Sequence, residues 1–259
     1  NNKDKCETMH NGVIFVKPEI HTGILPRLEQ ELGLQRKAAK KRKAAAEKGS
    51  VEAVIFDGEQ NAIKIVMNSL YGMSGSPTAT IPCVEIAASI TAQGRYNLLS
   101  AKKYVEENYC KFTGQPKSAK VIYGDSDSIF IKMPDIDVET AIKYGKLLEK
   151  NITRDLYHKA NALCMEYEKV FCPLLLVTAK RYSGRKYEFD HTQSSLNSNG
   201  LQLVKRDSPE LCKHTMKGFF ELVLMKNDKK AAGEFVREAI RKLMNDEHPL
   251  EHFVLTKKI

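Results

Sequence analysis

Hydrophobic positions recur with helical spacing in the first part of this chain. Leu25, Leu28 and Leu32 lie three or four residues apart and form one apolar stripe. Pro26 is favourable in the first turn of a helix. The pattern therefore predicts a helix that begins near Pro26 and continues to about Lys48.

The turn residues Gly49-Ser50 interrupt that pattern, and a second helix is predicted from about Gly58 to Tyr71, with Gly72 as its C-terminal stop. Two helices joined by a short turn form an antiparallel helical hairpin. The same rules predict the remaining elements. They are strands at 12–16 and 170–178, helices at 85–107, 138–156, 211–226 and 229–245, a hairpin centred on Ser183-Gly184 and a loop at 192–200.

The stretch Val121-Ile-Tyr-Gly-Asp-Ser-Asp-Ser-Ile129 combines two β-type runs with a polar turn. Gly124 is expected to permit the turn, so we predict a β-hairpin whose tip carries Asp125 and Asp127. Carboxylates held this close repel one another unless a cation lies between them, which favours a hard divalent metal ion. An ordinary acidic turn is the alternative for Asp-Ser-Asp by itself.

Polar and basic residues also share helix faces in the first two helices. Lys64, Asn68 and Tyr71 follow i, i+4, i+7 spacing, so a cation, an amide and an aromatic ring are aligned for phosphate, sugar and base. On the facing helix Arg36, Lys40 and Lys43 share a face as well. Four cations converging between two helices would repel one another unless they bind a polyanion such as a triphosphate. A solvated basic face or a localisation signal is the alternative for residues 40–43.

Composition is that of a globular protein with a basic surface. The 259 residues are 42% hydrophobic and 28% charged, and 41 Lys+Arg against 32 Asp+Glu give a net charge of +9, which suits a polyanionic partner. The six cysteines are scattered, which disfavours disulfides and zinc and favours a reducing, intracellular compartment. The longest apolar run, 171–179, is too short to span a bilayer, and no secretory leader is visible. The chain starts at Asn1, which leaves open that it is a fragment of something longer.

Six motifs in one order resemble those of the family B DNA polymerases. Two of them are the fingers motif Lys64-x-x-x-Asn68-Ser-Leu-Tyr-Gly72 and the palm metal motif Tyr123-Gly-Asp-Ser-Asp-Ser128, usually written with Thr between the aspartates. The other four motifs are Gly23-Ile-Leu-Pro26 with Arg36-Lys37-x-x-Lys40, Lys180-Arg-Tyr182, Gly200-Leu-Gln-Leu-Val-Lys-Arg-Asp207 and Phe253-Val-Leu-Thr-Lys-Lys258. In addition to these six motifs, the segment 81–95 is similar to the delta-type replicases of eukaryotes and their relatives in large DNA viruses.

The sequence also departs from the family pattern. The first palm motif, Asp-x-x-Ser-Leu-Tyr-Pro-Ser, and the exonuclease domain are absent from these residues. Ala179 replaces the first Lys of the Lys-Lys-Arg-Tyr motif, which weakens one expected duplex contact. Because the missing motif supplies a metal ligand in the family, the chain alone is expected to be inactive.

The resemblance implies an α+β fold with an antiparallel palm sheet backed by helices, a two-helix antiparallel fingers region and part of a helical thumb. The implied domains are palm at 1–24, fingers at 25–74, palm at 75–212 and the start of the thumb at 213–259. The implied function is DNA-directed DNA polymerase, which adds deoxynucleotides from dNTP to a primer 3′-hydroxyl during DNA replication.

The resemblance also assigns roles to residues. Asp127 is the direct ligand of two Mg²⁺ ions and Asp125 supports it. The implied dNTP-binding residues are Arg36, Lys40, Lys64, Asn68 and Tyr71, and the implied primer-template-binding residues are Lys180, Arg181, Tyr182, Lys205 and Arg206. The implied partners are primer-template DNA, dNTP, a sliding clamp or other processivity factor and the upstream part of the same polymerase, acting in the nucleus or at a viral replication site and not at a membrane.

Two other functions stay open. The chain could be a non-catalytic nucleic-acid-binding module or one half of a split polymerase, with its basic surface used for binding. An RNA-templated polymerase is disfavoured, because such enzymes share the acidic hairpin but not the motif ending in Asn68-Ser-Leu-Tyr-Gly72.

Overall fold

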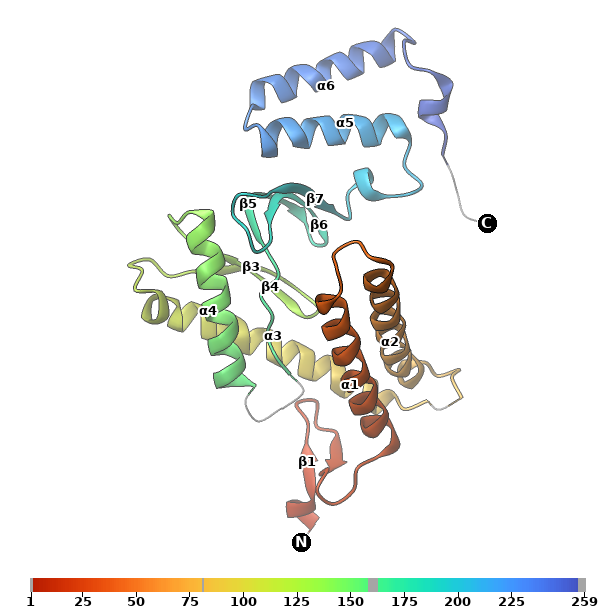
Figure 1. Cartoon of the computed structure of the whole chain (residues 1–259), viewed down its shortest axis with the longest axis vertical. Coiled ribbons are helices and arrows are strands. Elements are labelled where there is room, and N and C mark those ends of the chain that lie inside the picture. Colours follow the sequence, from red (N-terminus) through yellow and green to blue (C-terminus); the bar gives the residue numbers. More distant parts are fainter. Residues whose placement is uncertain (1, 81, 158–162, 256–259) are drawn as a thin grey trace. The chain divides into compact units, whose positions relative to one another are not determined.

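Helices alternate with small antiparallel sheets along the chain (Figure 1). The computed structural model describes residues 2–80, 82–157 and 163–255. These residues divide into two compact units, 1–97 and 98–259, and the boundary falls inside the long helix α3 (Val84–Thr113). The predicted α+β class is confirmed, and the strands within the described part form three separate antiparallel sheets.

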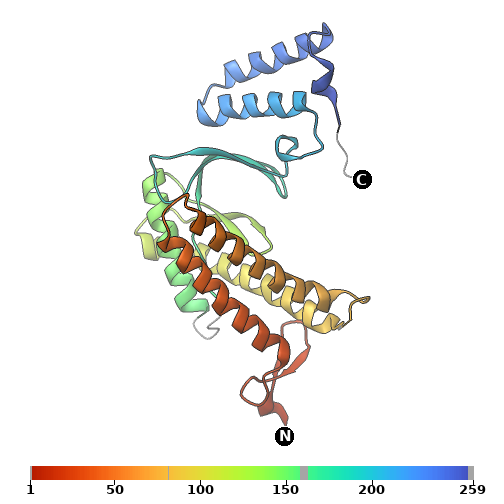
Figure 2. The same cartoon turned by 45° about the vertical axis from the view of Figure 1, so that its right-hand side comes forward.

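The first unit contains a small β-hairpin followed by two long helices. A 3₁₀ turn (Asn2–Lys5) leads into strand β1 (Cys6–Thr8), which pairs with β2 (Ile14–Val16) and was not predicted from the sequence. Helices α1 (Ile24–Ala45) and α2 (Val51–Gly75) lie side by side (Figures 1 and 2). The predicted helical hairpin is therefore confirmed.

The bounds predicted for the second helix were wrong at both ends. Helix α2 begins directly after Ser50, whose hydroxyl accepts a hydrogen bond from the Ala53 N–H at 3.2 Å, as a helix N-cap does. Gly58 and Gly72 both lie inside the helix. A helical glycine costs only about 1 kcal/mol relative to alanine, and the packing of a 25-residue helix against α1 outweighs that cost.

Strands β3 (Lys120–Asp125) and β4 (Ser128–Lys132) form the predicted acidic hairpin and pack against α3 and α4 (Val138–Leu156). Helix α4 has the bounds predicted for it. The core of this unit joins α3, through Val105 and Tyr109, to α4, through Leu148 and Ile152. One face of the β3–β4 hairpin is thereby fixed on two helices.

The third sheet consists of β5 (Val170–Thr178), β6 (Arg181–Tyr187) and β7 (Ser195–Asn199). The prediction of a hairpin centred on Ser183-Gly184 was wrong, because the turn lies at residues 179–180 and Gly184 is inside β6. A Cβ on Gly184 would approach Phe171 Cδ1 to 2.7 Å, so glycine is needed for packing and not for a turn.

The loop predicted at residues 192–200 was also wrong, because it contains β7. Strand β7 pairs along β6 from Tyr182↔Asn199 to Lys186↔Ser195. Ser and Asn have low strand propensity, but pairing with an existing strand overrides such a local preference.

The last part of the chain is helical, as predicted. Helix α5 (Glu210–Phe220) continues into a π-helical turn (Glu221–Met225) and is followed by α6 (Lys229–Met244) and a 3₁₀ turn (Leu250–Phe253). Leu201, Phe220 and Leu224 form a small core there. The motif at 200–207 resembles a strand of the family that leads to the thumb, but here it contains a 3₁₀ turn (Gln202–Val204). Residues 256–258 of the last predicted motif lie outside the described residues.

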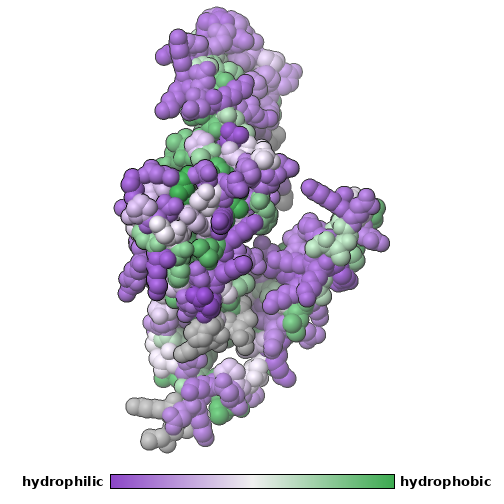
Figure 3. All heavy atoms as spheres, turned by 60° about the vertical axis from the view of Figure 1, so that its left-hand side comes forward, coloured by the Kyte–Doolittle hydropathy of each residue, from purple (hydrophilic) through white to green (hydrophobic). Residues whose placement is uncertain are grey.

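Two further predictions concern disulfide bonds and membrane-spanning segments. All six cysteines are free. Among the residues described, no helix is long and apolar enough to cross a membrane. The face drawn in Figure 3 is mostly hydrophilic, with hydrophobic residues in small separate patches.

Candidate active site

The acidic hairpin closes with a two-residue turn. Asp125 and Ser128 are its last paired residues, Ser126 adopts a left-handed φ of 56°, and Asp127 lies in the turn. The predicted acidic tip is therefore present, but the prediction that Gly124 makes the turn was wrong. Gly124 is inside β3, where a Cβ would lie 3.0 Å from Leu98 Cδ2.

An irregularity in β3 decides which way Asp125 points. The register shifts between Val121, which pairs with Ile131, and Tyr123, which pairs with Phe130. Val121 and Ile131 pack on the α3–α4 core, whereas Phe130 lies on the other face of β4 and contacts Tyr123. A bulge of this kind re-aims the side chains that follow it. Asp125, two residues beyond Tyr123, consequently shares its face and points away from the core.

Lys180 lies against that face of the hairpin. Its ammonium Nζ is 3.1 Å from Asp125 Oδ1, and its backbone N–H donates to the Tyr123 hydroxyl at 2.8 Å. The Lys180 ammonium holds the pKa of Asp125 below its ordinary value. A predicted metal ligand and a predicted DNA-binding residue are thus in direct contact.

Asp127 has a different environment. Its side chain is exposed, and within 2–80, 82–157 and 163–255 it makes no hydrogen bond or ion pair. An exposed carboxylate with free oxygens has the chemistry that Mg²⁺ prefers. In the described part of the chain no group of three or more His, Cys, Asp or Glu could hold a metal ion. The carboxylates therefore fit a hard divalent cation but supply only part of a ligand set.

Tyr182 supports the turn that carries Lys180. It is only 9% exposed, its ring meets Phe130 and Phe171 edge to face, and its hydroxyl accepts a hydrogen bond from Asn199 Nδ2 at 3.1 Å. Of the other predicted DNA-binding residues, Arg181 and Arg206 are exposed and Lys205 is half-buried. The exposed side chain of Arg181 can therefore approach a phosphate of the DNA backbone.

The basic residues of the helical hairpin do not all stay unpaired, contrary to the prediction. Lys43 Nζ forms an ion pair with Asp57 Oδ1 at 2.7 Å, and Arg36 Nε donates to Gln60 Oε1 at 3.4 Å. Gln60 in turn donates to Asp57 Oδ1 at 3.0 Å. The Lys43 ammonium and the Gln60 amide hold the pKa of Asp57 below its ordinary value. Carboxylates of α2 thus neutralise part of the basic face of α1.

Lys40 and Lys64 are exposed and make no hydrogen bond or ion pair with any described residue. Asn68 and Tyr71 border an apolar pocket of about 380 Å³ together with residues of α1 and α3. Burial raises the pKa of Glu29 beside it. Lys64 does not line this pocket. Of the three residues predicted on one helix face, Lys64 therefore extends into solvent, whereas Asn68 and Tyr71 lie at the pocket edge.

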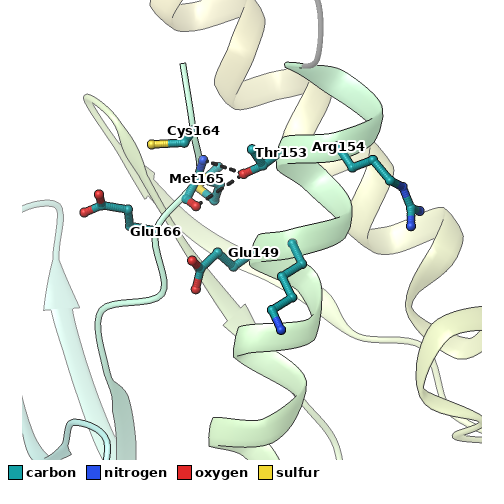
Figure 4. Close-up of a pocket in the computed structure, with 7 residues that line it drawn as sticks. Glu149, Thr153, Arg154, Cys164, Met165 and Glu166 are labelled. Carbon is teal, nitrogen blue, oxygen red and sulfur yellow. Dashed lines mark hydrogen bonds between the residues drawn. The ribbon is translucent and has the colours of Figure 1, made fainter. Parts of the chain in front are cut away.

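A second pocket lies in the other unit and contains no predicted site residue. It measures about 400 Å³ and lies between α4 and the segment 164–166 (Figure 4). The Thr153 hydroxyl accepts from the Met165 N–H at 2.9 Å and donates to its carbonyl at 3.4 Å. Figure 4 shows Arg154 pointing away from the two glutamates, Glu149 and Glu166. The polar groups do not converge, so this depression is not a candidate for catalysis.

Sequence reasoning missed the residues that position the site. Tyr123 and Gly200 stood inside recognised motifs but received no role. Asp57 and Gln60 were also missed, although for Asp57 an acidic residue facing a basic helix is a readable signal. The bulge at residue 122 has no signal in the sequence.

The predicted site residues fall into two sets. The five assigned to nucleotide binding lie in residues 1–97, and the two carboxylates and the DNA-binding residues lie in 98–259. Within these sets the structure brings Asn68 and Tyr71 to one pocket edge and Lys180 to Asp125.

Known proteins resemble this chain over nearly its whole length. A family model described as DNA polymerase family B matches residues 1–259. The chain is 34% identical to the DNA polymerase delta catalytic subunit of Candida albicans over 247 residues, which is 95% of this chain and 23% of the relative. It is 31% identical to that subunit of Drosophila melanogaster over 256 residues, 99% of this chain and 23% of the relative.

A viral protein is similar as well. The chain is 36% identical to the DNA polymerase of Paramecium bursaria Chlorella virus NY2A over 244 residues, 92% of this chain and 26% of the relative. The chain thus spans about a quarter of the length of these relatives.

Proposed function

The chain belongs to family B of the DNA polymerases, and we propose that it supplies the palm, fingers and start of the thumb of a DNA-directed DNA polymerase. The reaction is transfer of a deoxynucleotide from dNTP to a primer 3′-hydroxyl. The observation that carries the proposal is the acidic hairpin, with Asp127 exposed and unpaired within the described residues and Asp125 beside it. The domains are palm at 1–24, fingers at 25–74, palm at 75–212 and thumb from 213.

Asp127 is the direct metal ligand in this proposal, and Asp125 supports it. The contrast in their surroundings favours this division, because Lys180 already neutralises Asp125 whereas Asp127 has no such partner among described residues. Two Mg²⁺ ions supply charge stabilisation for the attacking and leaving oxygens of the phosphoryl transfer.

Lys64 and Lys40 bind the triphosphate, because among the cations predicted for nucleotide binding these two are exposed and have no partner in the described part. Arg36, whose guanidinium donates a hydrogen bond to Gln60, also contributes positive charge to triphosphate binding. Positive groups held near the leaving pyrophosphate offset its developing charge. Asn68 and Tyr71 form the floor of the nucleotide pocket, and Tyr71 is 43% exposed at its edge.

The turn at Lys180 and Arg181, with Lys205 and Arg206, binds the backbone of the primer-template. Contacts of this kind do not depend on base sequence and weaken as salt rises. Tyr182 holds the turn in place. The partners are primer-template DNA, dNTP, a processivity factor such as a sliding clamp and the remainder of the polymerase, in the nucleus or at a viral replication site.

Primer extension with Mg²⁺ tests the proposal. The purified chain is compared alone and after mixing with an upstream segment that carries the first palm motif. We expect no incorporation by the chain alone, because two carboxylates are only part of a ligand set, and incorporation on mixing. Salt-sensitive duplex binding without incorporation in either case would favour the binding-module function instead.

A further inference from the structure

The tips of two hairpins that are far apart in the sequence meet at one lysine. The backbone N–H of Lys180, in the β5–β6 turn, donates to the hydroxyl of Tyr123, 57 positions earlier, and its ammonium lies 3.1 Å from Asp125. Phe130 contacts both Tyr123 and Tyr182. The β5–β6 turn is therefore anchored beside the acidic hairpin through side chains of both sheets.

The backbone of this lysine is fixed, and its side chain is not. Lys180 adopts a left-handed φ of 61°, and Gly200 lies so close that a Cβ there would be 2.1 Å from the Lys180 carbonyl oxygen. The Lys180 side chain is nevertheless 71% exposed, against 31% for Asp125. The ammonium can therefore leave Asp125 by side-chain rotation while the turn stays in place.

We propose that Lys180 is a positioning residue that competes with a divalent cation for Asp125 and thereby couples cation binding to duplex binding. The inference rests on the proposed function, in which the hairpin binds the cation and the β5–β6 turn binds DNA. One ammonium cannot pair fully with both Asp125 and a phosphate. A cation on the hairpin takes over Asp125 and frees Lys180 for the DNA backbone, and by linkage DNA strengthens cation binding equally.

An ion pair that only supports the fold makes different predictions. The same hairpin has a matched pair at its open end, where Lys117 is bonded to Asp135. Both partners of that pair are exposed, and neither touches the acidic turn. Its variants remove a lysine charge or an aspartate charge at the opposite end of the β3–β4 hairpin without affecting Asp125, so they are the controls.

The first experiment measures Mn²⁺ binding to the purified chain without DNA by electron paramagnetic resonance. Lys180→Met is expected to bind Mn²⁺ about two- to fivefold more tightly than wild type, the range of an exposed ion pair. Lys180→Arg should restore wild-type binding, and Lys117→Met should not change it. Equal Mn²⁺ affinity in wild type and Lys180→Met would overturn the inference.

The second experiment measures primer-template binding by fluorescence anisotropy in EDTA at constant ionic strength. Asp125→Asn should tighten binding about two- to fivefold by releasing Lys180, and Asp135→Asn should not. In a Lys180→Met background the effect of Asp125→Asn should disappear, which a general change in charge would not produce. An undiminished effect in that background would overturn the coupling. Absence of any duplex binding by wild type counts against the proposed function, while the Mn²⁺ result still decides the competition for Asp125.

Discussion

The α1–α2 hairpin and the corner where β3–β4 meets β5–β6 both carry charged residues, but they hold them differently. In the helical hairpin, pairs such as Lys43–Asp57 join neighbouring helices separated by one short turn, and Lys40 and Lys64 extend into solvent. At the β corner, the contact between Lys180 and Asp125 depends on three backbone features. These are the bulge in β3, the left-handed φ of Lys180 and the close approach of Gly200 to the Lys180 carbonyl.

The difference concerns how much of each site exists before a ligand binds. The exposed lysines of the helical hairpin must lose side-chain freedom when they bind a triphosphate, which costs up to about 2 kcal/mol for each side chain. At the β corner the backbone and the aromatic rings already fix the carboxylate face. Changes there should therefore affect chemistry and folding, whereas changes in the helical hairpin should affect mainly nucleotide binding.

The largest effect is expected for Asp127 at the β corner. In a full-length polymerase containing this segment, Asp127→Ala should lower primer extension about a hundredfold or more while duplex binding stays largely intact, because a direct metal ligand is lost. Asp125→Ala should lower it less. Single-turnover incorporation and anisotropy measure the two quantities, and equal losses for both variants would contradict the division of roles.

Gly200→Ala should destabilise the second unit by roughly 2–4 kcal/mol, because φ is +64° and the new Cβ would collide with the Lys180 carbonyl. Urea unfolding followed by circular dichroism measures this loss. The matched change in the helical hairpin is Gly58→Ala, where a Cβ meets nothing within 4 Å. That variant should be more stable than wild type by about 0.5–1 kcal/mol. Similar losses for both variants would remove the contrast between the regions.

Lys64→Ala should raise the KM for dNTP by about tenfold or more, because a charge-assisted contact to phosphate is lost. Steady-state kinetics of the same full-length polymerase provide the values. Lys43→Ala serves as the control from the neighbouring helix, since Asp57 already engages its ammonium, and its KM should change less than threefold. An unchanged KM and kcat for Lys64→Ala would refute its phosphate role.

The smallest effect concerns pH and Asp57. Its pKa is below the ordinary 3.8 in the folded chain because of Lys43 and Gln60. The resulting stabilisation is complete above that ordinary pKa and is lost as pH falls through the lower folded-state value. The difference in urea midpoint between wild type and Asp57→Asn should therefore shrink from pH 7 to pH 3. A difference that stays constant with pH would show that the Asp57 charge contributes nothing.

Local patterns predicted the elements whose stability is local. The 138–156 helix and the 170–178 strand have the predicted bounds, because the spacing of their apolar residues and the residue types at their ends indicate the same limits. The turn at Ser183-Gly184 and the loop at 192–200 were predicted wrongly from residue preferences. Gly184 serves contact with Phe171, and β7 forms because β6 offers it hydrogen bonds.

The sequence by itself determined the family, the order of the motifs and the acidic hairpin, since these depend on residue identity and on spacing along one short segment. Only the tertiary structure decided that Asp125 turns away from the core, that Lys180 pairs with it, and that Asp57 takes Lys43 away from the predicted cluster. These outcomes depend on a bulge and on packing between segments distant in sequence. Such contacts form in the folded chain because burying the aromatic and aliphatic side chains fixes the strands, and the charges then pair with whichever groups that packing places beside them.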